Sequence, residues 1–145
     1  MRRGSVVVLA LLGCVGCLPM SAPFHLYPIN SSPQKPPVLC RVKIHFGWQT
    51  ATITAALTDR DMYSGSFPLT SATPNRELAP YWDQVFGSGY FNAKVLGTPR
   101  HFRAGLKNSE GAEIILEMHQ IPGDSHGGME GVAIDTNKTI YKAGY

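Results

Sequence analysis

Apolar residues recur at every second position over most of the chain after residue 37, and this alternation constrains the fold more than any other feature. A period of two is typical of a β-strand with one buried face. Runs of this kind lie at 38–46, 50–57, 63–69, 91–95, 102–106, 114–118, 130–135 and 139–143. The chain is therefore predicted to be mainly β, with about eight strands.

The connections between these runs are short, which favours antiparallel pairing of strands that follow one another in the chain. Residues 108–111 are predicted to form a hairpin turn in which Gly111 takes a positive φ. We therefore expect an antiparallel meander that closes into a small barrel or forms a strongly curled sheet. A two-sheet β-sandwich is the alternative.

The period changes at 79–86, where one short helix is predicted. Trp82, Val85 and Phe86 are spaced as one helix face, and Gly87 is a typical stop. We expect these three side chains to plug the open end of the sheet. An exposed aromatic ridge that binds a ligand is the alternative for Trp82.

The first residues have the composition of a secretory signal peptide. Two arginines precede an apolar run at 6–12, and a small residue, Gly13, precedes Cys14. The run is far shorter than the roughly 20 residues that a helix needs to span a bilayer. Residues 1–13 are therefore predicted to be removed during export.

The sequence Leu11-Leu12-Gly13-Cys14 resembles the lipobox of bacterial lipoproteins. The resemblance implies that Cys14 becomes the first mature residue and carries acyl chains such as palmitate, which together anchor a protein stably. Val15 is not the aspartate that retains many lipoproteins at the inner membrane, which implies an outer-membrane address in a cell with two membranes. Cys17 offers a second possible cut, with Cys14 where the motif prefers leucine, and the other alternative is an ordinary signal cut near Ala22.

Removal of the leader also changes the net charge. The full chain has 13 Lys and Arg, so loss of Arg2 and Arg3 leaves 11 against 10 Asp and Glu, a net charge of about +1. This excess is too small for the electrostatic footprint of a nucleic-acid-binding protein. We therefore exclude nucleic acid as a partner.

Residues 14–37 are rich in proline and are predicted to form the lipidated N-terminus and an extended tether. In the alternative, this segment packs on the domain through Phe24, Leu26 and Tyr27. The β-domain is then expected at 38–145. Cys40 shares the apolar face of the first predicted strand, so we expect a buried free thiol, with a disulfide to Cys17 as the alternative.

Two long segments extend the family resemblance. They are YWDQVFGSGYFNAKVLG at 81–97 and GVAIDTNKTIYKAGY at 131–145, and with the lipobox they resemble a group of small uncharacterised bacterial lipoproteins. The resemblance implies a cell-envelope domain facing the periplasm or the cell exterior. It transfers no catalytic residue.

The densest group of metal-ligating side chains lies between residues 117 and 130. Glu117 and His119 share a strand face. We expect the glycine-rich loop that follows to fold His126 back toward them. Such a nitrogen and oxygen set suits zinc or copper. The alternative is a set of solvated polar residues on a surface loop.

A second candidate site is a strand face with a positive bias that carries His101 and Arg103. This face suits acidic headgroups or glycan carboxylates, with a solvated strand face as the alternative. Asp124-Ser125-His126 holds the residue types of a hydrolytic triad, but neighbours in sequence rarely converge on one reacting atom. The residues give no other catalytic set.

These observations lead to one functional prediction. The chain is expected to be a lipid-anchored, non-catalytic envelope domain without a cofactor that binds a protein, a glycan or an apolar ligand. A small zinc- or copper-handling envelope protein is the alternative, and a hydrolase is the third hypothesis.

Overall fold

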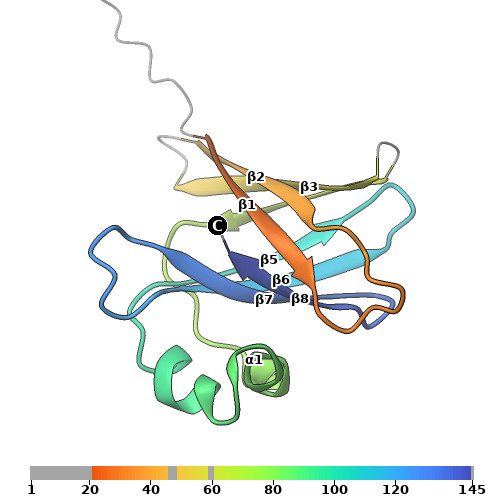
Figure 1. Ribbon diagram of the computed structural model, residues 1–145. Coiled ribbons are helices and arrows are strands. Elements are labelled where there is room, and N and C mark those ends of the chain that lie inside the picture. Colours follow the sequence, from red (N-terminus) through yellow and green to blue (C-terminus); the bar gives the residue numbers. More distant parts are fainter. Residues whose placement is uncertain (1–20, 46–48, 59–60, 145) are drawn as a thin grey trace, which may run out of the picture.

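The computed structural model describes residues 21–45, 49–58 and 61–144, which form one closed antiparallel barrel. Every strand pairs with the next along the chain, and the first pairs with the last (Figure 1). The strands are β1 (Ser21–Pro28), β2 (Val38–His45), β3 (Thr50–Thr58), β4 (Asp61–Pro68), β5 (His101–Lys107), β6 (Glu113–Gln120), β7 (Met129–Asp135) and β8 (Ile140–Gly144). The predicted small barrel is confirmed, and the sandwich is excluded.

The barrel interior is filled by the apolar half of each alternating run, because successive side chains of a strand point to opposite faces. The fully or almost fully buried residues of this interior core include Phe24, Leu26, Cys40, Ile53, Leu106, Ile114, Leu116 and Tyr141. Cys40 is a free thiol, and burial raises its pKa to about 12. The alternation along the sequence therefore identified the inward face of each strand that it detected.

The segment predicted to be a tether contains a strand of the barrel, so that prediction is wrong for Ser21–Pro28. Phe24 and Leu26 are buried in the core, whereas Tyr27 points outward. Proline is tolerated at Pro23 because pairing with β8 starts only at His25, so β1 has one neighbour at that position, like an edge strand. The domain thus includes residues from Ser21 onward. The signal peptide and Cys14 lie outside the described residues.

The sheet has a sharp corner between β4 and β5, where Ser64 and Lys107 form the single pair in register. A Cβ atom on Gly65 would overlap the carbonyl oxygen of Gly105, so the two backbones touch at this corner. Glycine permits this approach. The connection across the corner is long and carries all of the described helical structure.

That connection forms a second layer on the outside of the barrel. It contains a 3₁₀ turn η1 (Arg76–Leu78), the helix α1 (Ala79–Phe86) and a π-helical turn η2 (Phe91–Val95). The layer packs below β5–β8, on the side away from β1–β3 (Figure 1). Its buried contacts consist of Leu78, Trp82, Phe91, Val95, Val132, Ile134 and Ile140.

Two predictions about this region need correction. The helix at 79–86 is confirmed, but its buried face covers the outer wall and does not plug the barrel end. Phe91–Val95 is helical, not a strand. Phe91 and Val95 are buried while Ala93 is exposed, so the buried residues recur every fourth position. Apolar residues at 91, 93 and 95 fit both this period and the period of two of a strand, so the sequence pattern did not separate the two structures. The Asp83 carboxylate accepts a hydrogen bond from the Phe91 N–H at 2.9 Å and supports this turn.

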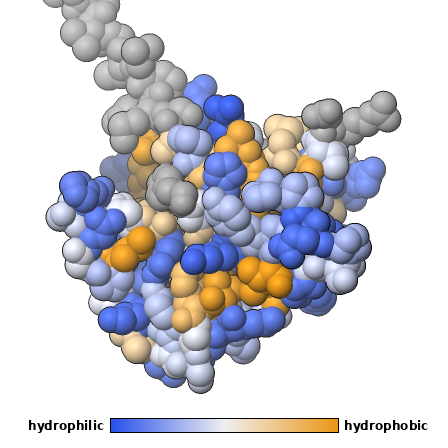
Figure 2. Space-filling view, in the orientation of Figure 1, coloured by the Kyte–Doolittle hydropathy of each residue, from blue (hydrophilic) through white to orange (hydrophobic). Residues whose placement is uncertain are grey.

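The face seen in Figure 2 is largely hydrophilic, with hydrophobic residues in small patches among polar ones. Exposed large apolar residues in the described part of the chain include Met62, Ile29, Tyr27 and Leu39. Single exposed apolar side chains are normal on protein surfaces. Within the described residues, no helix is long and apolar enough to cross a membrane.

Candidate functional site

A cavity of about 220 Å³ occupies one end of the barrel interior. Ala22 lines it from the start of β1, Ile44 from near the end of β2, and Met129 from the start of β7. These positions belong to the same end of an antiparallel barrel, the end at which the odd-numbered strands begin. The cavity therefore lies at the end of the barrel at which β1 enters the sheet.

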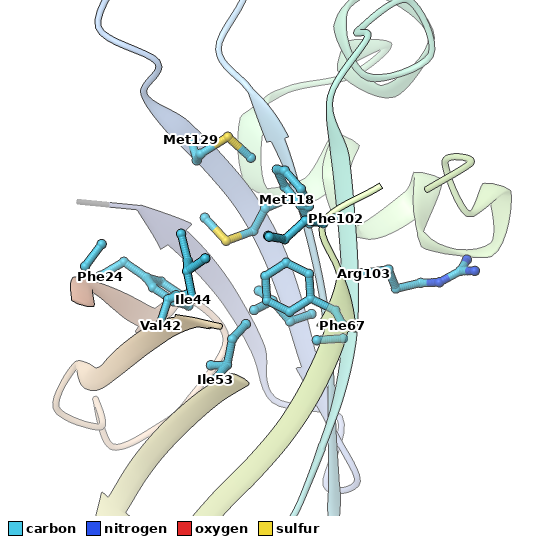
Figure 3. Close-up of a pocket in the computed structure, with 13 residues that line it drawn as sticks. Phe24, Val42, Ile44, Ile53, Phe67, Phe102, Arg103, Met118 and Met129 are labelled. Atoms are coloured by element: carbon cyan, nitrogen blue, oxygen red, sulfur yellow. The ribbon is translucent and has the colours of Figure 1, made fainter. Parts of the chain in front are cut away.

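The cavity is lined by apolar side chains from seven of the eight strands or their ends. Figure 3 shows Phe24, Val42, Ile44 and Ile53 facing Phe67, Phe102, Met118 and Met129 across it. Arg103 contributes to the lining, but its guanidinium extends away from the cavity, through the wall to the outside (Figure 3). The interior thus presents no charge to a ligand from any of the residues labelled in this view.

The cavity is lined by rigid aromatic rings and by flexible methionine side chains. The rings of Phe67 and Phe102 meet edge to face, with centroids 5.5 Å apart. This is a favourable geometry for aromatic pairs. Met118 and Met129 have unbranched thioether side chains that adjust to ligands of different shape. An engineered cavity of about 150 Å³ binds benzene, so about 220 Å³ accommodates about nine carbon atoms.

The predicted metal ligand Glu117 serves another purpose. Its side chain is buried on the outer face of β6, beneath the helical layer. Oε1 accepts a hydrogen bond from Trp82 Nε1 at 3.0 Å, and Oε2 accepts one from the Asn75 N–H at 2.9 Å. Because both oxygens are used, this carboxylate fastens η1 and α1 to the sheet. Trp82, with none of its surface exposed, is an anchor for the layer and not an exposed ridge.

The second predicted ligand, His119, lies two residues further along the same face and is also fully buried. Its Nε2 is 3.2 Å from Glu130 Oε1, and its Nδ1 is 3.0 Å from the Thr98 hydroxyl. The Tyr90 hydroxyl also donates to Glu130. A hydroxyl, an imidazole and a carboxylate therefore form a chain that joins the segment after η2 to β6 and β7.

Burial sets the ionisation of this chain. It lowers the pKa of His119 below the usual value for histidine, and the nearby Glu130 carboxylate opposes this shift without cancelling it. Burial and the hydrogen bond to Glu130 both raise the pKa of Tyr90. With His119 neutral, Nε2–H donates to Glu130 and Nδ1 faces the Thr98 hydroxyl, which also contacts the Lys94 carbonyl at 2.5 Å.

The helical layer covers His101 but not Arg103, so the two predicted binding residues lie in different environments. His101 is buried, with Nε2 2.7 Å from the Val95 carbonyl and Nδ1 without a hydrogen-bond partner among the described residues. Its ring stacks on that of His119, with centroids 5.8 Å apart. Arg103 is exposed, as is Lys107 on the same strand. Only the last two therefore belong to an accessible basic face.

The third predicted ligand, His126, does not join Glu117 and His119. It is exposed in the loop before β7, where its backbone N–H donates to the Asp124 carboxylate at 2.8 Å. Asp124 also accepts from the Gly128 N–H at 2.9 Å, so it closes the loop. No group of three or more His, Cys, Asp or Glu side chains within residues 21–45, 49–58 and 61–144 is arranged to hold a metal ion.

Sequence reasoning missed the cavity and two members of the buried chain, Thr98 and Tyr90. The inward positions around the cavity were predicted, but a pattern of apolar residues does not reveal where their volumes fail to fill the barrel. Thr98 and Tyr90 lie in the long connection, whose path depends on tertiary packing. Comparisons with protein-family models, curated proteins and solved structures found no match to this chain.

Proposed function

We propose that this protein is a lipid-anchored protein of the bacterial cell envelope whose barrel binds an apolar ligand in the cavity at one end. The observation that carries the proposal is the cavity itself, which is apolar, about 220 Å³ in volume and partly open. Small closed barrels of eight strands have interiors wide enough for side chains or one small ligand. The ligand class is therefore a hydrocarbon chain or ring, without a catalytic role for the barrel.

The composition of the cavity favours this class over a glycan or a protein. A glycan site needs convergent polar groups that satisfy its hydroxyls, and unpaired polar groups in an apolar cavity are costly. Figure 3 shows carbon and sulfur atoms facing inward, and the one labelled cation faces outward. An alkyl chain has no hydrogen bonds with water to lose when it enters such a cavity, and each carbon that it buries makes binding more favourable.

The position of β1 supports the proposed lipid anchor. A signal cut near Ala22 removes the first residues of β1, including those that pair with Lys43 and Val42. A cut before Cys14 leaves the whole strand in the mature chain. The chain from Cys14 to Ser21 spans at most about 25 Å when fully extended. A lipid on Cys14 thus holds the barrel close to the membrane, for which an outer membrane is the proposed address.

A series of linear alcohols tests the cavity, with binding measured by calorimetry. Each added methylene should raise the affinity about fourfold while it enters the cavity. The rise should stop at about nine carbons, when the volume is filled. An affinity that does not depend on chain length, or an absence of binding at every length, would contradict the proposal.

Two substitutions locate the binding. Ala104→Leu places three more carbons in the cavity, so the affinity for the best alcohol should fall by about tenfold or more. The control is Ala112→Leu, because Ala112 packs on the core at the opposite end of the barrel and does not line the cavity. Equal losses in the two variants would place the binding elsewhere.

The anchor has a separate test. Cells expressing the chain with Cys14→Ser should lose incorporation of labelled palmitate and release the barrel from the membrane fraction. Cys17→Ser serves as the matched control and should retain both properties. Palmitate incorporation that survives Cys14→Ser would overturn the proposed lipidation site.

A further inference from the structure

The outward positions of the barrel strands divide by charge. In β1–β5, the side chains opposite to the core include Arg41, Lys43, Arg103 and Lys107, all exposed, and none of the outward positions of these described strands holds Asp or Glu. In β6–β8, the outward positions hold three glutamates and one lysine. A chain with almost no net charge therefore carries a basic stretch of outer wall, which we name the basic wall after these four residues, two on β2 and two on β5.

The strand register connects three of the four cations along the wall. Lys107, Ser64, Thr54 and Arg41 follow one another across β5, β4, β3 and β2 as directly paired residues. Three such steps cover about 14 Å along a wall that curves around the closed barrel, so Lys107 and Arg41 face different sides. Lys43 is two positions beyond Arg41 on the same face. The residues between Lys107 and Arg41 are Ser64 and Thr54, so no large side chain stands between the charged groups along the wall.

The cations are not neutralised within the described protein. None of the four makes an ion pair or a side-chain hydrogen bond with another described residue. Lys107 is opposite Glu113 in the register, and Arg103 is opposite Glu117. Glu117 is already bonded to Trp82, whereas the partly buried Glu113 and the exposed Glu110 in the following turn lie near Lys107. The positive charge is therefore least opposed at Arg41 and Lys43, whose paired residues on β1 and β3 include no carboxylate.

The place where the chain enters the barrel identifies the partner. Ser21, the first described residue of β1, is paired with Lys43. The predicted anchor at Cys14 thus attaches beside the basic wall, within about 25 Å at full extension. A tethered barrel can present the β2 side of this wall, with Arg41 and Lys43, to the surface that holds its anchor, whereas the acidic outer face of β6–β8 is turned away and partly covered by α1 and η2.

We infer that the β2 side of the basic wall, with Arg41 and Lys43, docks on the anionic phospholipid headgroups of the membrane that carries the protein. The inference rests on the proposed membrane address but not on the cavity. Cations near an anionic bilayer each contribute about fivefold to membrane partitioning. Docking by the wall provides a second attachment besides the acyl chains and fixes which side of the barrel faces the membrane.

The test uses the unlipidated domain from Ser21, because all eight strands and both buried clusters lie in residues 21–144. Its binding is measured with phosphatidylcholine vesicles and with vesicles that contain about 30% phosphatidylglycerol. The domain should bind the anionic vesicles only, and about 1 M salt should abolish the binding. Equal binding to both vesicle types would overturn the inference, whatever the outcome of the alcohol titration.

A pair of double variants separates the wall from total charge. Arg41→Gln with Lys43→Gln should reduce partitioning into anionic vesicles about 30-fold. Arg76→Gln with Lys94→Gln removes the same charge from exposed positions of the helical layer and should change partitioning less than about twofold. Equal losses in both double variants would show that binding follows net charge and would refute a docking face.

Discussion

The outer wall of the barrel has two halves that differ in cover and in charge. Over β6–β8, the wall is apolar and acidic and is sealed by α1 and η2, with Glu117 and His119 buried beneath the layer. Over β1–β5, most outward side chains are accessible and include hydroxyls and the four cations, with His101 at the start of β5 as a buried exception. The comparison shows that the same strand pattern, one residue in and one residue out, supports a second core on one side and an accessible surface on the other.

The difference has an energetic meaning. On the covered side, polar atoms have left water and depend on specific partners, so each lost partner is costly. On the basic wall, the same kinds of atoms keep their hydration, and their removal changes the surface potential more than the free energy of unfolding. Substitutions should therefore affect stability on one half and binding on the other.

The largest expected effect comes from Trp82→Ala, which empties the centre of the helical layer. Loss of this fully buried ring should lower the free energy of unfolding by about 3–5 kcal/mol in urea titrations. The matched change on the open half is Met62→Ala, where the side chain is 52% exposed and the loss should stay within about 0.5 kcal/mol. Similar losses at both positions would contradict the division of the wall into two halves.

A smaller effect is expected from Glu117→Gln, which preserves shape but places an amide NH₂ against one of two N–H donors. The free energy of unfolding should fall by about 1–3 kcal/mol. Glu113→Gln on the same strand should change it by less than about 0.5 kcal/mol, because the Glu113 side chain makes no hydrogen bond with another described residue. An unaffected Glu117→Gln protein would show that the carboxylate does not fasten the layer.

The covered half should also respond to pH. Burial lowers the folded-state pKa of His119 below its unfolded value of about 6.5, so the unfolded chain binds the proton more readily as the pH falls. The contribution to stability is complete above about pH 6.5 and declines below it, by up to about 1 kcal/mol near pH 5.5. Urea titrations at several pH values should show this decline, and His119→Gln should reduce it. A stability that rises on acidification would mean that His119 is charged beside Glu130.

The smallest effect on stability is expected on the basic wall. Arg41→Gln with Lys43→Gln should change the free energy of unfolding by less than about 0.5 kcal/mol, because both side chains are exposed. The melting temperature provides the measurement, on the same preparation that is used for vesicle binding. A loss above about 1 kcal/mol would show that the two cations stabilise the folded state, and it would count against their role in docking.

The sequence was sufficient for the barrel because burial in a closed sheet follows a strict period of two, which runs such as Ile114 to Met118 display openly. It was insufficient for β1, whose prolines resemble a linker, and for Phe91–Val95, where the helical layer decides the conformation. Glu117 and His119 were correctly placed on one face. Their partners Trp82, Asn75, Thr98 and Tyr90 come from a segment whose path only tertiary packing determines.

Closure of the barrel depends on the pairing of β1 with β8, the first and last strands along the chain. Until Ile140–Gly144 arrives, the sheet has two open edges, and each edge exposes unpaired backbone groups that can join another chain. A ring closed by its last strand cannot be completed while the chain is still crossing a membrane from its N-terminal end. For the proposed export, the order of the strands implies that the fold is completed only after Ile140–Gly144 has crossed the membrane.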